Sequence, residues 1–178
     1  MTEVKVEILN IGDLPEQFKV DYSGIMKEIL NSEEFAKFCF GRKFKFTRLS
    51  GGQVLSTLLR GNENWNMQED YEWDVTKVVL SHDGPGVVGH CFLGKEGIYS
   101  NLDAIKYPWE LIGNMAHEMT HFLGFTHPYL AGKSWTPWGH KYKGVSYDVG
   151  YFFRDMAKKI IENKTRDVNL IREIIHGK

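Results

Sequence analysis

Apolar positions in the first forty residues change from a two-residue period to a helical period. Charged and apolar residues alternate over 3–8, which predicts a strand with one buried face. Asp13 then provides an N-cap, and apolar residues recur at helical spacing over 18–29. The helical pattern is interrupted, resumes over 33–40 and stops at Gly41. A strand followed by two helices is therefore predicted.

The middle of the chain predicts mostly short strands. Phe44 and Phe46 alternate with polar residues and indicate a second strand, and a short helix is predicted over 53–59. The polar segment 61–74 is typical of a loop. Further strands are predicted from short apolar or β-branched runs at 75–81, 87–93 and 97–101.

A striped helix follows these strands. Pro108 stands where proline suits a helix start, apolar residues then recur at helical spacing, and Gly124 ends the pattern. Residues 131–144, rich in Gly, Trp and Pro, are expected to form a long loop. Two amphipathic helices are predicted at about 149–162 and 167–175. The order of elements predicts a single α+β domain.

Composition narrows the class of protein. The chain has 178 residues, a formal net charge of −1 and 42% hydrophobic residues, which is ordinary for one globular domain. No basic patch stands out, so nucleic acid and membranes are not expected as partners. No signal region and no membrane-spanning run is evident, so we expect a cytoplasmic protein or one released by lysis. Cys39 and Cys91 are expected to be free, buried thiols.

The candidate chemistry lies in residues 117–127, HEMTHFLGFTH, which hold three of the seven histidines. His117 and His121 are four residues apart on the predicted helix, so both imidazoles face one side and can bind one ion. Gly124 allows a sharp exit from the helix, after which the chain can return His127 to that ion. Three nitrogen ligands leave a fourth position for water, the pattern of a catalytic zinc site.

Glu118 follows the first histidine and points toward the open side of the ion. There it can accept a proton from a water on the metal and later pass it to the leaving amine. The competing interpretation is ordinary packing, since a histidine on a helix is more often a core residue than a ligand. The five fixed positions of HExxHxxGxxH have a chance occurrence on the order of 1 in 10⁵ in such a chain, which favours the metal site.

This stretch resembles the extended zinc-binding motif of the metzincin metallopeptidases. Residues 83–86 (DGPG) and 89–92 (GHCF) resemble the segment before the active helix in matrix metalloproteinases. Residues 97–101 (GIYSN) resemble the edge strand that lines the substrate cleft in this class. The resemblance covers roughly residues 75–150, and the compact form is similar to small metallopeptidase-like proteins of bacteria and their phages.

The resemblance implies a zincin-like fold. An upper lobe of about residues 1–127 would carry a twisted, mixed but mostly parallel sheet and the active-site helix. A small helical lower lobe of about 128–178 would close the cleft from the other side. Ile98, Tyr99 and Ser100 would then bind an extended peptide by strand addition.

The chain departs from the metzincin pattern below the metal. Metzincins have a methionine turn there, often with a tyrosine two residues later. The best match is residues 144–148 (GVSYD), which places Val145 at the methionine and Tyr147 at the tyrosine. Tyr147 either contacts the metal or the oxyanion, or packs as an ordinary side chain. Met156 falls in a predicted helix and is expected in the core.

A second metal is the next question. His90 matches a histidine that binds a structural zinc in matrix metalloproteinases, but its partners are not evident, and Tyr99 stands near where another histidine is expected. We therefore expect one zinc, with His90 as an exposed or hydrogen-bonded strand residue. Trp135, Trp138 and Tyr142 either form an aromatic wall of the substrate pocket or pack the lower lobe.

These observations predict a monomeric zinc-dependent endopeptidase acting on a peptide or protein substrate. His117, His121 and His127 would hold one Zn²⁺, Glu118 would be the general base, and Tyr147 would assist. Two alternatives stay open. The first is a zinc-binding interaction or virion-type structural protein that does not cut. The second is an amidase acting on cell-wall peptide.

Overall fold

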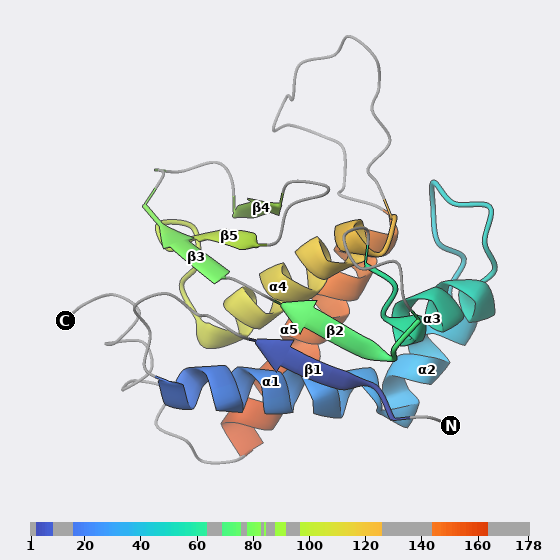
Figure 1. Ribbon diagram of the computed structural model, residues 1–178, viewed down its shortest axis with the longest axis horizontal. Coiled ribbons are helices and arrows are strands. Elements are labelled where there is room, and N and C mark those ends of the chain that lie inside the picture. The colour runs from blue at the N-terminus through green and yellow to red at the C-terminus, as the bar shows by residue number, and fades with distance from the viewer. Residues whose placement is uncertain are drawn as a thin grey trace, which may run out of the picture.

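The computed structural model describes residues 3–8, 16–63, 69–75, 78–82, 84, 88–91, 97–125 and 144–163. In chain order, the elements are β1 (Lys5–Ile8), α1 (Glu16–Leu30), α2 (Glu33–Phe40), α3 (Gly51–Arg60), β2 (Glu72–Val75), β3 (Val78–Ser81), β4 (Gly89–Cys91), β5 (Ile98–Asn101), α4 (Pro108–Phe122) and α5 (Val145–Asn163) (Figure 1). The protein therefore mixes helices with small sheets, which agrees with the α+β prediction.

The strands form two small sheets within the described residues. β1 and β2 pair in parallel, with Val6 opposite Trp73. β3 pairs in parallel with β5, and β4 pairs antiparallel with β5, so that β5 is the inner strand. β1 packs on α1, whereas β4 and β5 pack on α4. The three-stranded sheet therefore lies beside the helix that carries the metal motif.

Two predictions for the segment between α2 and β3 are wrong. Phe44 and Phe46 form no strand; the chain turns there, and Phe46 is exposed with a φ of 63°. The polar segment 61–74 was expected to be a loop, yet it contains most of β2. Trp73 explains this strand, because its fully buried side chain alternates with polar neighbours in the two-residue period of a strand. Of the strand predicted over 75–81, residues 78–81 form β3 and Val75 is the last residue of β2.

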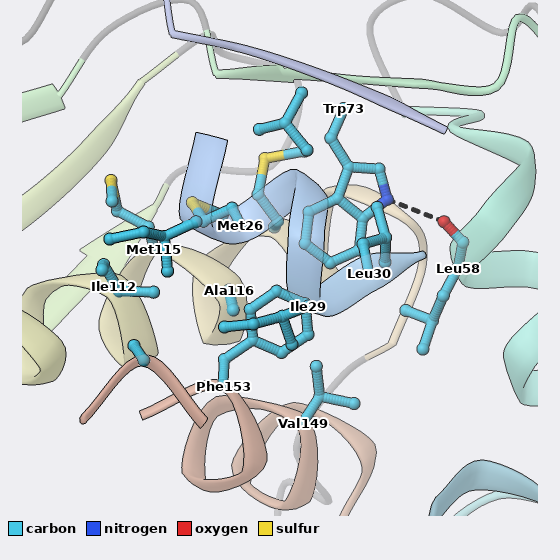
Figure 2. Close-up of a cluster of buried hydrophobic side chains, with 14 of the residues drawn as sticks. Met26, Ile29, Leu30, Leu58, Trp73, Ile112, Met115, Ala116, Val149 and Phe153 are labelled. Atoms are coloured by element: carbon cyan, nitrogen blue, oxygen red, sulfur yellow. Dashed lines mark hydrogen bonds between the residues drawn. The ribbon is translucent and has the colours of Figure 1, made fainter. Parts of the chain in front are cut away.

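Trp73 also lies at the centre of the main hydrophobic core. Its indole Nε1 donates a hydrogen bond to the carbonyl oxygen of Leu58 at 2.7 Å, and its ring stacks on Phe153 of α5 with 5.7 Å between centroids. Figure 2 shows these residues together with Ile29 of α1 and Met115 of α4. One core thus joins the β1–β2 sheet to α1, α4 and α5, and α4 is held firmly from several sides.

Helices α4 and α5 lie side by side (Figure 1), and their backbones meet at two glycines. A Cβ atom at Gly113 would lie 2.9 Å from the carbonyl oxygen of Gly150. A Cβ atom at Gly150 would lie 2.9 Å from the Cβ atom of His117. Only glycine permits so close a contact without displacing one helix. The first turns of α5 are therefore placed directly against the metal motif.

Most predicted helix boundaries are confirmed. The Ser32 hydroxyl caps α2, Gly41 follows the end of that helix, and α4 begins at Pro108. Helix α5 begins at Val145, earlier than the predicted start near residue 149. The Asp13 cap, the loop up to residue 143 and the helix predicted over 167–175 lie outside the described residues. No helix of the described part has both the length and the apolar character needed to span a membrane.

Candidate metal centre

The metal motif stands near the end of α4. His117, Glu118 and His121 each offer a ligand atom, and these atoms lie within 4.8 Å of one another. The two imidazole centroids are 5.0 Å apart with the ring planes at 80°, and Nε2 of His117 lies 4.0 Å from Oε1 of Glu118. The structure therefore brings three predicted site residues together. His127, the predicted third histidine ligand, lies outside the described residues.

The end of α4 orients the second histidine. Gly124 has a φ of 91° and donates its N–H to the carbonyl oxygen of His121, while the N–H of Phe125 bonds the carbonyl oxygen of Thr120. These two bonds form a Schellman motif. The turn brings the Phe125 carbonyl oxygen to His121 Nδ1 at 2.5 Å. A carbonyl oxygen only accepts hydrogen bonds, so Nδ1 carries the proton and Nε2 keeps its lone pair for a metal.

Burial shifts the pKa values of Glu118 and His121 in this cluster. Glu118 is only 4% exposed. Its burial raises the pKa of the carboxyl group to about 7, while hydrogen bonds from Cys91 act in the opposite direction. Burial also lowers the pKa of His121, against the raising effect of its bond to Phe125. Neutral imidazole is the form that binds metals, and a carboxyl group titrating near neutral pH suits proton transfer.

Helix α5 supplies the wall beside His117. The ring of Tyr147 meets the His117 ring edge to face, with 4.6 Å between centroids. Val145 is buried and lines the same pocket as Leu123 and Phe125. Residues 145–148, which were matched to a methionine turn, are instead the first turn of a helix. Met156 is packed against the core, as predicted.

A buried pair of hydroxyl groups joins α4 to α5, and sequence reasoning missed it. The Thr120 hydroxyl donates to the carbonyl oxygen of His117 at 2.8 Å and shares a 2.6 Å hydrogen bond with the Ser146 hydroxyl. Ser146 Oγ lies 3.5 Å from His121 Nδ1. Thr120 stands between the two histidines in the motif, but nothing in the sequence indicates that Ser146 would face it.

The assignment of the edge strand is wrong. Residues 97–101 were expected to line the cleft as an edge strand, but β5 is paired on both sides, and β3 and β4 are the edge strands of the described sheet. Ile98 and Ser100 are fully buried, and Ser100 Oγ accepts a hydrogen bond from the amide of Asn114 on α4. These two side chains therefore support α4. On β4, the Cys91 thiol donates to the backbone carbonyl oxygen of Glu118 at 3.8 Å.

The other singled-out residues divide clearly. His90 stacks on Tyr99, with 4.7 Å between ring centroids, and is half-buried on the sheet. Cys39 is a fully buried free thiol, as predicted, and burial raises its pKa to about 12. Cys91 is also free but only half-buried. The aromatic residues at 135, 138 and 142 lie outside the described residues.

The described residues contain a second group with metal-binding geometry. Glu7, Glu72 and Asp74 offer carboxylate oxygens within 4.8 Å of one another across β1 and β2. These side chains are exposed or half-buried, unlike Glu118.

Comparisons of the chain with protein-family models, with curated proteins and with solved structures found no match.

Proposed function

We propose that the protein is a zinc-dependent endopeptidase. The observation that carries the proposal is the orientation of His121 next to His117 and Glu118. The Phe125 carbonyl oxygen accepts the Nδ1 proton, which makes Nε2 the ring nitrogen of His121 that would bind a metal. His117, His121 and His127 are the residues that would hold the metal, and imidazole nitrogens with an open fourth position suit zinc. A bound zinc supplies a Lewis acid that polarises the scissile carbonyl and lowers the pKa of a water molecule.

Glu118 is the proposed general base. Its carboxyl group is buried beside the ligands, and its pKa is raised to about 7 by that burial. It would accept the proton of the attacking water and then deliver it to the nitrogen of the leaving amine. A buried site also excludes bulk water, which strengthens electrostatic interactions with the developing charge. Tyr147 would assist by donating its phenol proton in a hydrogen bond to the oxyanion.

The substrate would lie along β4. This strand is at the edge of the three-stranded sheet, and its Cys91 side chain touches the backbone of Glu118. An extended peptide added to such an edge makes main-chain hydrogen bonds in a fixed register. A peptide bound along this edge would therefore pass beside Glu118, the proposed base. This arrangement favours a peptide substrate over a small amide.

Metal content and cleavage test the proposal together. Desalted protein should carry about one zinc per chain by elemental mass spectrometry, as a single three-histidine site requires. Casein should be cleaved by the wild type and not by Glu118→Ala, while both proteins hold the same amount of zinc. Absence of zinc after reconstitution would refute the metal site.

The same assay separates the alternatives. Zinc without cleavage of any peptide would support a zinc-binding interaction or structural protein. Release of fragments from purified cell-wall sacculi, with casein left intact, would support an amidase acting on cell-wall peptide. Equal cleavage by wild type and Glu118→Ala would exclude Glu118 as the base.

A further inference from the structure

We infer that Thr120 and Ser146 are positioning residues for the two metal-binding histidines of α4. The inference rests on the proposed zinc site and assigns a task to the first turn of α5. Thr120 lies on α4 between the two ligands, and Ser146 comes from α5. Both residues are buried, with 0% and 2% of their surface exposed. Their hydroxyl groups therefore depend on partners within the protein.

Thr120 alone would carry little meaning. A threonine hydroxyl in a helix often bonds a carbonyl oxygen of the preceding turn, as Thr120 does with His117 at 2.8 Å. The contact with Ser146 distinguishes this case, because it comes from a residue 26 positions later in the sequence. The hydroxyl pair thus connects the backbone of the first ligand to a second helix.

Ser146 extends the connection to the second ligand. Its Oγ atom lies 3.5 Å from Nδ1 of His121, the nitrogen whose proton the Phe125 carbonyl oxygen accepts. Two acceptors on one side of the ring oppose its rotation away from the metal position. Changes to such partners of ligating histidines typically weaken metal affinity 10- to 100-fold. Ser146 therefore helps to hold the Nε2 lone pair in the direction that a metal requires.

The glycine crossing explains why Ser146 can reach this position. Gly150 lies one helical turn beyond Ser146. Because it has no side chain, α5 can approach His117 so closely that a Cβ atom at position 150 would lie 2.9 Å from the Cβ atom of His117. Arg42 holds the same turn from outside through a 2.6 Å ion pair with Asp148. The start of α5 is thus fixed on two sides. A rigid support of this kind is what a preorganised ligand set needs.

Isosteric and conservative variants provide the test. Thr120→Val removes the hydroxyl group and nearly keeps the shape, whereas Thr120→Ser keeps the hydroxyl group. Ser146→Ala removes the other half of the pair. Zinc affinity of the full chain would be measured by competition with a chromophoric chelator. The absorption spectrum of the Co²⁺-loaded protein would report ligand geometry, and urea unfolding of metal-free protein would report stability.

We expect Thr120→Val and Ser146→Ala to bind zinc about 10-fold more weakly or worse, and to alter the Co²⁺ spectrum. Thr120→Ser should stay close to the wild type in both measurements. If the wild type binds zinc and both hydroxyl-deleting variants bind it equally well, the positioning role is refuted while the metal site stands. An equal loss in Thr120→Ser and Thr120→Val would also refute it. A wild type that binds no zinc would refute the proposed function and this inference together.

Discussion

Two groups of side chains each bring three potential metal ligands within 4.8 Å of one another. The groups differ in residue type, in burial and in the elements that carry them. His117, Glu118 and His121 share one helix, and their positions follow from its period. Glu7, Glu72 and Asp74 meet across two paired strands. In the histidine group, Nδ1 of His121 contacts the Phe125 carbonyl oxygen and Ser146 Oγ. The carboxylate group lies on the outer face of a sheet that covers the core.

The difference teaches that proximity alone does not define a metal centre. Surface carboxylates approach one another without consequence, because water and salt screen their repulsion. The buried carboxyl group of Glu118 is not solvated in this way. Its raised pKa reflects the free-energy cost of ionising a carboxyl group away from water. Carboxyl groups with strongly raised pKa values cluster at functional sites, and Glu118 differs from the buried Glu63 in lying beside two histidines. The predictions below test this contrast between the two groups, beginning with the largest effect.

Removing a ligand from the histidine group should have the largest effect. We expect His121→Ala to weaken zinc binding by more than about 100-fold, because losing a ligand costs more than losing the partner of a ligand. Cleavage of casein should disappear with it. Elemental mass spectrometry and a chelator competition would measure the change. Retention of zinc by this variant would mean that His121 is not a ligand.

Neutralising the base should affect catalysis without affecting the metal. Glu118→Gln should lower kcat by about 10²- to 10⁴-fold, the usual contribution of a general base. Zinc content should stay at the wild-type level, because the amide replaces a group that is not a proposed ligand. A parallel loss of zinc would instead make Glu118 a ligand. Steady-state kinetics and metal analysis on the same preparation distinguish the two.

The helix crossing predicts a loss of stability. Gly150→Ala places a methyl group 2.9 Å from the Cβ atom of His117, which neither helix can accommodate without moving. We expect the free energy of unfolding to fall by about 1–3 kcal/mol, as for other overpacked cores. Urea unfolding would measure it. Gly24→Ala is a matched control, since a Cβ atom at Gly24 has no neighbour within 4 Å.

The buried carboxyl group of Glu63 predicts a pH dependence of stability. Burial raises its pKa to about 7, although backbone hydrogen bonds from Asp74 and from Glu63 itself lower it, and the charges of Asp74 and Asp70 add smaller raising effects. The folded protein then binds this proton more tightly than the unfolded chain does. The protonated group therefore stabilises the folded state. This contribution to the free energy of unfolding is fully present below about pH 4.5 and is lost as the pH rises through about 7.

Glu63→Gln isolates this contribution. Its side-chain oxygen can still accept the backbone N–H of Asp74, which Oε1 of Glu63 accepts at 3.2 Å. We expect the variant to gain on the order of 1–2 kcal/mol over the wild type between pH 5 and pH 8. Urea unfolding of metal-free protein at both pH values would show it. A difference independent of pH would mean that Glu63 does not titrate in this range.

The carboxylate group should give the smallest effect. Glu72→Gln is expected to leave zinc content and casein cleavage at wild-type levels. Its side chain is half-buried, and the opposite Lys5 in the strand register offers a positive charge nearby. Loss of one zinc equivalent in this variant would overturn the contrast between the two groups.

The sequence predicted the helical parts of the fold better than the strands. Amphipathic spacing, Ser32, Gly41 and Pro108 place helix boundaries through interactions between near neighbours. β2 was missed, because Trp73 lies in a polar segment that concealed the alternation of buried and polar positions. The inner position of β5 could not be predicted either. Strand order depends on contacts between distant segments, which a local pattern does not contain.

By itself, the sequence determined the α4 half of the candidate metal centre. The spacing of His117, Glu118 and His121 and the glycine at 124 act within one helix and its end, where neighbours in sequence are neighbours in space. Only the tertiary structure decided what faces that half. Ser146 and Tyr147 reach it because two glycines let α5 approach. Strand β4 reaches it because it pairs with β5, and both strands pack on α4. Such contacts arise from packing between segments far apart in the chain, and only the folded molecule specifies them.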